Sequence, residues 1–223
     1  MSRRSTRVVC ASVLAMSTLA AGTARAQSAP AAPDRSDGWN QATQLLAMSS
    51  LALEALLPRI FYSDPDVTVG WKARWHVSVL APTMTITALA LLNEQSLKSA
   101  FADPRPGCAA GSTDQPGCAT YGFISTPSFV AGSALGQGAG VFLVDTLRWN
   151  HGAVHPGALV GQAGVPLVTT LIVSAGRSAG NWESAAQSWS SAGIGLVVGL
   201  GLGALYATMQ RPECGYTGNL ACW

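Results

Sequence analysis

Five apolar segments recur along this chain, separated by stretches that hold its polar residues and many of its prolines. They run from about Ala42 to Tyr62, Val77 to Leu92, Ser128 to Val144, Gly157 to Ala175 and Trp189 to Met209. The last three each lie within more than 20 uncharged residues, which suits a helix that crosses a bilayer. The first two are weaker, because the first contains Glu54 and Arg59, and either could be a span or an interfacial helix. The pattern predicts an all-α membrane helical bundle of about five helices.

Glycine recurs every four residues in the third and fifth segments, at Gly132, Gly136 and Gly140 and at Gly195, Gly199 and Gly203. Small residues on one stripe of a helix allow two backbones to approach closely in a membrane. We therefore expect these helices to pack closely, the alternative being that glycine is simply abundant in spans.

Composition supports the membrane class. Only 11% of the residues are charged and 48% are hydrophobic, whereas a soluble domain carries about 25% charged residues. The mean hydropathy of +0.28 is modest because many residues are small. No basic patch with interleaved aromatic residues is present, so we expect no nucleic-acid partner.

The first 26 residues have the pattern of a secretion signal. Arg3, Arg4 and Arg7 precede an apolar core, and Ala24-Arg25-Ala26 fits a cleavage site, with an uncleaved anchor as the alternative. This segment carries four arginines and no acid, so the mature net charge is 2 − 4 = −2. We expect a signal peptide over 1–26, a flexible linker over 27–38, a helical domain over 39–210 and a tail over 211–223.

The distribution of basic residues predicts an orientation. With the mature amino terminus outside and five spans, the cytoplasmic side receives Lys72, Arg74, Arg148 and Arg211, in agreement with the positive-inside tendency. The opposite side receives Lys98, Arg105 and Arg177. We therefore expect a bacterial inner-membrane protein whose three cations gather on the periplasmic side.

The cysteines fit this orientation in part. Cys108 and Cys118 bracket a short periplasmic loop and predict a disulfide worth roughly 2–3 kcal/mol. Cys214 and Cys222 would be cytoplasmic thiols if there are five spans, or a second disulfide if there are not. No histidine lies near either pair in sequence, so we expect neither a metal site nor a cofactor.

Three cations occur at a recognisable spacing. Lys98 and Arg105-Pro106 form K-x6-R-P, Pro127-Ser128 begins an apolar segment, and Arg177 follows 49 residues after Ser128. Over roughly 83–207 the chain resembles the type 2 phosphatidic acid phosphatase superfamily, which includes bacterial acid phosphatases and vanadium haloperoxidases. The family pattern is K-x6-R-P, then P-S-G-H, then S-R-x5-H-x3-D.

The resemblance implies a phosphate site. Lys98, Arg105 and Arg177 would neutralise the phosphate oxygens, and Ser128 would donate a further hydrogen bond. In the family one histidine attacks phosphorus, an aspartate orients it, and a second histidine protonates the leaving oxygen.

The chain departs from the family pattern at those catalytic positions. Val130 stands at the acid position, Glu183 at the nucleophile position and Gln187 at the orienting position, while Phe129 and Gly176 replace the family's glycine and serine. A valine cannot transfer a proton. Glu183 could in principle be phosphorylated, but we expect it to pair with the cations instead.

No other residue offers a clear substitute. His76, His151 and His155 fall near the cytoplasmic face in this topology, where loop or interface roles are expected. Ser128 lacks an evident base, and Asp103 precedes a proline and fits a turn.

The sequence leaves three functions open. The favoured hypothesis is a catalytically impaired relative of the phosphatases (phosphoric ester hydrolases) that binds an anion or acts as a scaffold. The first alternative is an active membrane phosphatase for lipid phosphate or polyprenyl diphosphate with a non-standard nucleophile. The second is a soluble periplasmic acid-phosphatase-like domain. A phosphate-bearing lipid or another phosphoester is the expected partner, together with the membrane.

Overall fold

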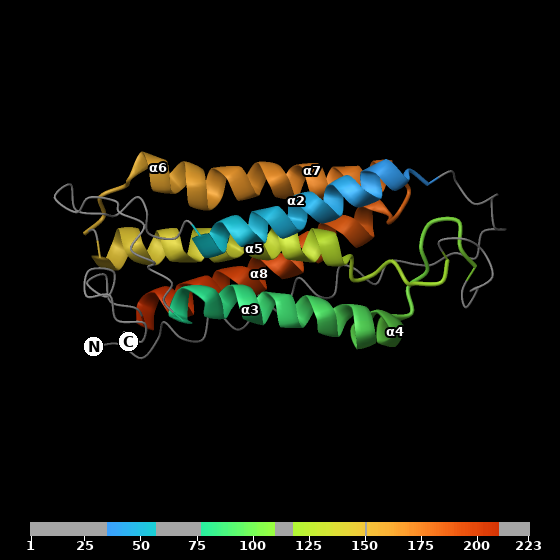
Figure 1. Cartoon of the computed structure of the whole chain (residues 1–223), viewed down its shortest axis with the longest axis horizontal. Coiled ribbons are helices and arrows are strands. Elements are labelled where there is room, and N and C mark those ends of the chain that lie inside the picture. The colour runs from blue at the N-terminus through green and yellow to red at the C-terminus, as the bar shows by residue number, and fades with distance from the viewer. Residues whose placement is uncertain (1–34, 57–76, 110–117, 150, 210–223) are drawn as a thin grey trace, which may run out of the picture.

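The computed structural model describes residues 35–56, 77–109, 118–149 and 151–209, and within these ranges it contains helices and no strand. The helices form five rods that run along a common long axis (Figure 1). In chain order the rods are α2 (Asp37–Leu56); α3 (Val77–Leu92), η2 (Asn93–Leu97) and α4 (Lys98–Phe101); α5 (Thr126–Val144) and η3 (Asp145–Trp149); α6 (Pro156–Leu159), η4 (Val160–Gly164) and α7 (Val165–Ala179); and α8 (Ala185–Met209). The η segments are short π-helices. The prediction of an all-α bundle of about five helices is confirmed.

Three of these rods are long and apolar enough to cross a membrane. They are Thr126–Arg148, Pro156–Ala179 and Ala185–Met209. Large apolar side chains are exposed on the second and third of them, among them Val168, Leu171, Val197 and Leu205. These features indicate membrane association, and the two segments that the sequence marked as weaker are not among the three.

Helix α5 is the central rod, in contact with α2, α3, α7 and α8. Its most intimate partner is α8, because the two glycine stripes face each other. A Cβ atom on Gly136 would overlap the Leu196 carbonyl oxygen, and a Cβ on Gly199 would overlap the Ser133 carbonyl oxygen. The expected close packing is therefore confirmed, and it follows from the absence of side chains at these positions.

The amino-terminal end of α2 falls within the predicted linker. Ser36 caps the helix by accepting a hydrogen bond from Trp39 N at 3.3 Å, and Asp37 lies in the first turn. Ser36 N also donates to Gly180 O at 3.2 Å. Of the linker predicted over 27–38, the described residues 35–38 thus include the cap and the first two residues of α2.

Several predictions lie outside the described residues. These concern the signal peptide, the linker before residue 35, His76, the pair Cys214 and Cys222, and the tail.

Candidate functional site

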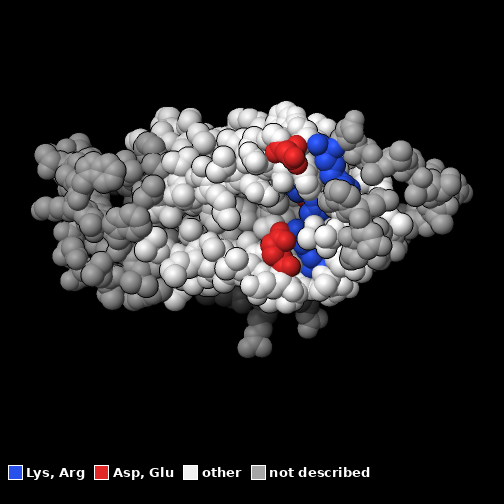
Figure 2. Space-filling model, turned by 45° about the vertical axis from the view of Figure 1, so that its right-hand side comes forward, with Lys and Arg blue, Asp and Glu red and all other residues white. Residues whose placement is uncertain are grey.

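Charged side chains concentrate at one end of the bundle, where α4 and α7 end and where α2, α5 and α8 begin. Figure 2 shows the basic and acidic groups in one band, with uncharged residues over the rest of the described surface in that view. Eight of the eleven described Lys, Arg, Asp and Glu residues belong to this end: Arg35, Asp37, Glu94, Lys98, Asp103, Arg105, Arg177 and Glu183. Such an arrangement marks this end as the candidate site.

Trp182 organises the guanidinium groups. The Cζ atoms of Arg105, Arg177 and Arg35 lie 5.1, 5.7 and 5.7 Å from its ring centroid. The indole Nε1 donates to Ser36 O at 2.9 Å, which fixes the ring against the start of α2. Each cation–π contact stabilises a guanidinium by roughly 0.5–2 kcal/mol. The predicted convergence of Arg105 and Arg177 is present, and Arg35 and Trp182 are additions that sequence reasoning missed.

Arg177 lies in the last turn of α7, and each of its three side-chain nitrogens donates a hydrogen bond. Its Nε and Nη2 donate to the two carboxylate oxygens of Glu183, and its Nη1 donates to Asn40 Oδ1. Asn181 adopts a left-handed φ of 56°, which turns the chain so that Glu183 returns to the guanidinium. The ion pair expected from the sequence is therefore present, and both partners are buried.

Lys98 has its own counter-ion. Its Nζ lies 2.6 Å from Glu94 Oε1, one helical turn earlier, and Thr126 donates to the same oxygen. Burial lowers the pKa of Lys98, and Glu94 partly offsets that shift. Burial raises the pKa of Glu94, but the hydrogen bonds from Lys98 and Thr126 outweigh it, so the pKa is lowered overall. The four-residue spacing of Glu94 and Lys98 is a signal that could have revealed this pair.

Arg105 differs from Lys98 and Arg177 in its hydrogen bonds and its neighbours. It is 7% exposed, its Nε donates to Thr120 O at 3.1 Å, and its Nη1 has no hydrogen-bond partner. The ion pairs within the described residues involve Lys98 and Arg177 but not Arg105. Burial is the largest cause that lowers the pKa of Arg105. The carboxylate of Glu183 raises this pKa, and the neighbouring guanidiniums of Arg177 and Arg35 lower it further. Among the described residues, Arg105 is thus a buried guanidinium without a carboxylate of its own.

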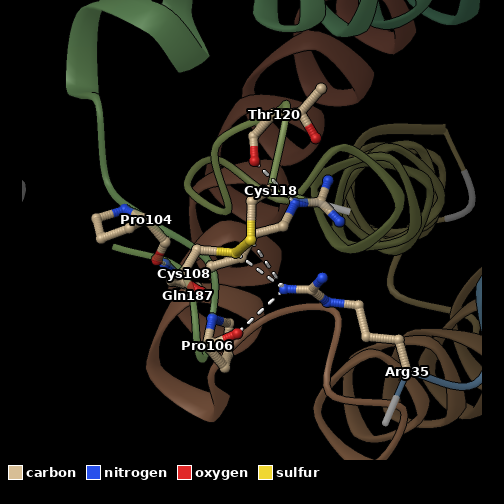
Figure 3. Close-up of a disulfide and its surroundings, with 8 residues drawn as sticks. Arg35, Pro104, Pro106, Cys108, Cys118, Thr120 and Gln187 are labelled. Carbon is tan, nitrogen blue, oxygen red and sulfur yellow. Dashed lines mark hydrogen bonds between the residues drawn. A yellow bond between two sulfur atoms is a disulfide. The ribbon is translucent and has the colours of Figure 1, made fainter. Parts of the chain in front are cut away.

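The loop that carries Arg105 is held by the predicted disulfide. Cys108 and Cys118 are bonded, with their Cα atoms 5.7 Å apart. Figure 3 shows Arg35 extending to this loop, where its Nη2 donates to Pro106 O at 3.1 Å and to Cys108 Sγ at 3.0 Å. The disulfide and the hydrogen bonds from Arg35 therefore both hold this loop in place.

Ser128 lies at the first turn of α5 in a small hydroxyl cluster. Its Oγ is 2.7 Å from Ser188 Oγ and accepts from Ser125 Oγ at 3.2 Å, and Ser188 in turn donates to Ser174 O. Val130, two residues further on, is 1% exposed within the apolar core. The side chain at the family's acid position therefore packs against other apolar groups and offers no proton.

Gln187 has a structural role at the start of α8. It forms a reciprocal cap with Ser184, in which Ser184 N donates to Gln187 Oε1 at 2.8 Å and Gln187 N donates to Ser184 Oγ at 3.1 Å. Its Nε2 donates to Asp103 Oδ2 at 2.8 Å and to Pro104 O at 2.9 Å. The residue at the orienting position thus ties the Arg105 loop to α8.

The two described histidines lie far from the cations. His155 directly precedes α6, which is at the opposite end of the bundle from α4 (Figure 1). His151 lies four residues earlier in the same connection, with a left-handed φ of 51°. Neither histidine therefore places an imidazole at the cationic end.

Neither protein-family models, curated proteins nor solved structures gave a match to this chain. The site is therefore interpreted from its own chemistry. Within the described ranges, no group of three or more His, Cys, Asp or Glu residues is placed to hold a metal ion. What the arrangement offers is a set of buried cations, two of them compensated and one not.

Proposed function

We propose that this chain is a membrane protein that binds a phosphate-bearing ligand at Arg105 and does not hydrolyse it by histidine chemistry. In this proposal it is a degenerate relative of the type 2 phosphatidic acid phosphatase superfamily. The cations of the family pattern are kept, and the groups that would attack phosphorus and transfer protons are replaced.

Arg105 carries the proposal. A buried cation is costly unless an opposite charge or hydrogen bonds compensate it. Within the described residues, Arg105 has neither a carboxylate partner nor a bond at Nη1. A guanidinium presents a planar fork of donors that matches two phosphate oxygens. A phosphate group is thus the anion that best completes this arrangement.

The position of Glu183 argues against turnover. A carboxylate that attacks phosphorus needs a free oxygen, yet both oxygens of Glu183 accept hydrogen bonds from Arg177. The replaced acid and orienting residues, Val130 and Gln187, are held in the core and in a helix cap. These three residues therefore offer no path for a proton to a leaving group.

The location of the site favours a lipid phosphate. The cations lie where two candidate spans begin, at Thr126 and Ala185, and where a third ends, at Ala179. Helix ends of membrane spans lie at the depth of lipid headgroups. We place this end on the periplasmic side of a bacterial inner membrane, because a disulfide belongs to an oxidising compartment and Arg148 is at the other end.

A phosphate-release assay tests the absence of catalysis. Purified protein in detergent should release no more phosphate from phosphatidic acid or undecaprenyl diphosphate than a Lys98→Ala, Arg177→Ala control. Turnover that disappears in Glu183→Gln would contradict the proposal and would favour an active phosphatase with a carboxylate nucleophile.

A further inference from the structure

A second buried acid lies away from the cationic end. Glu54 is near the end of α2 and is 1% exposed. Its Oε1 has no hydrogen-bond partner, and neither of the ion pairs within the described residues includes it. Helix α2 lies against α5 and α7, so this carboxyl group is enclosed by the bundle and is not exposed to solvent.

Gly138 on α5 creates the space for this carboxyl group. A Cβ atom at Gly138 would lie 2.6 Å from Glu54 Oε2 and would overlap the main-chain carbonyl oxygen of Gln162. The carboxyl oxygen and the carbonyl oxygen therefore border the same small space beside Gly138. Three rods, α2, α5 and α6–α7, contribute to it.

Gln162 contributes polar atoms that lack partners. Its side chain is fully buried, and neither Oε1 nor Nε2 has a hydrogen-bond partner. The π-helical segment η4, which contains Gln162, adjoins α7 at this point. Buried polar atoms without partners call for an explanation, and a bound water or ion is one that the chemistry allows.

The site lies at mid-depth of a candidate span. Within Thr126–Arg148, Gly138 is 12 residues from the first residue and 10 from the last. Ionisable residues at such a depth are costly and typically mark an ion or proton pathway. Of the described cations, Arg148 lies at the far end of this rod and is exposed, and the other four belong to the phosphate site. None of the cations within the described residues therefore compensates Glu54.

The number of charges defines the ligand. One carboxyl group and neutral carbonyl oxygens balance a single positive charge. Asp145, the next acid along this rod, is seven residues beyond Gly138, about 10 Å along a helix axis. It is too far along the rod to be a ligand at the same point, so a multivalent ion would remain uncompensated. We propose that Glu54 and Gln162 form a buried site for one monovalent cation, either a sodium ion or a proton.

The sodium arm uses thermal unfolding of the full chain in detergent. Sodium chloride is exchanged for N-methyl-D-glucamine chloride at constant ionic strength. If sodium occupies the site, saturating sodium should raise Tm by about 4 °C or more. The increase should disappear in Glu54→Gln and should remain in Asp37→Asn, a matched change of an exposed acid on the same helix.

The proton arm uses infrared spectroscopy of the same samples. If a proton occupies the site, the wild type should show a protonated-carboxyl absorption that is absent in Glu54→Gln and present in Asp37→Asn. Gln162→Leu should shift the frequency of this band, because it changes the polar surroundings proposed for the carboxyl group. This variant also serves if Glu54→Gln does not fold.

Either result supports the proposal and identifies the cation. A wild-type protein that shows neither sodium-dependent stabilisation nor a protonated carboxyl group assigned to Glu54 would overturn it. Effects that persist unchanged in both Glu54→Gln and Gln162→Leu would also overturn the proposal.

Discussion

Glu183 binds Arg177 through both of its carboxylate oxygens, so the guanidinium edge that a phosphate would use is already occupied. The pair is buried, and Asn40 takes the remaining nitrogen of Arg177. The chain thus supplies an internal anion at one of its three motif cations. Of the three motif cations, this leaves Arg105 as the one without a carboxylate partner among the described residues.

Removal of this internal anion should have two opposite effects. Glu183→Ala leaves Arg177 buried without its counter-ion, which should lower the free energy of unfolding by about 3–5 kcal/mol. The same change should strengthen binding of phosphate or vanadate several-fold, since a second guanidinium edge becomes available. Thermal unfolding and titration calorimetry measure the two effects, and Arg177→Leu with Glu183→Leu should recover much of the stability. No change in either property would count against the pairing account.

The glycine contacts predict that alanine substitutions at two glycines of α8 have different effects on stability. Gly199→Ala should destabilise the bundle by about 1–3 kcal/mol or more, because the new methyl group would overlap the Ser133 carbonyl oxygen and cannot avoid backbone. Gly201→Ala is the matched control, since a Cβ there meets nothing within 4 Å. It should be neutral or slightly stabilising. Equal effects of the two changes on Tm would refute the close approach of α5 and α8.

Reduction of the disulfide should weaken both folding and binding. Opening the bond between Cys108 and Cys118 should lower stability by roughly 2–3 kcal/mol, because the unfolded chain regains the freedom of a short loop. Phosphate affinity should also fall several-fold, since Arg105 is three residues from Cys108. Calorimetry with and without a reductant measures this, with Cys108→Ser, Cys118→Ser as the control that no longer responds. A reduced protein that binds phosphate as tightly as the oxidised one would contradict it.

Glu94 predicts a loss of stability in acid. The pKa of Glu94 is lowered in the folded state. Its contribution to stability is therefore present when the pH is above the pKa of the unfolded state, and it is lost as the pH falls through the pKa of the folded state. The window therefore lies below about pH 4.3. Because the side chain is 44% exposed, the effect should be below about 1 kcal/mol. Unfolding of Glu94→Gln between pH 7 and pH 3 should show a shallower decline than the wild type, and a parallel decline would argue against this carboxylate.

Sequence periodicity predicted the rods well, because the apolar segments and the glycine stripes are local signals that packing reinforces. Val77–Leu92 is a helix over the expected range, and α8 extends to the expected Met209. The disulfide and the pairing of Glu183 with Arg177 also followed from short spacings.

The residues that were missed depend on contacts between distant segments. Arg35 joins the site through Pro106, 71 residues away, and no local pattern shows that the segment before α2 folds back onto this loop. In the family pattern S-R-x5-H, the position of Trp182 is one of the five that can be any residue. Its ring nevertheless contacts three guanidinium groups. Such roles become visible only when the ends of several helices meet.

The central claim is that Arg105 holds the phosphate group, and titration calorimetry of its variants tests this most directly. Inorganic phosphate and nanodiscs that contain phosphatidic acid serve as ligands. Arg105→Ala should weaken binding by about 10-fold or more, because a charge-assisted fork is lost. Arg105→Lys should restore only part of the affinity, and Arg148→Ala, at the opposite end, should bind as the wild type does. Wild-type affinity in Arg105→Ala would contradict the account.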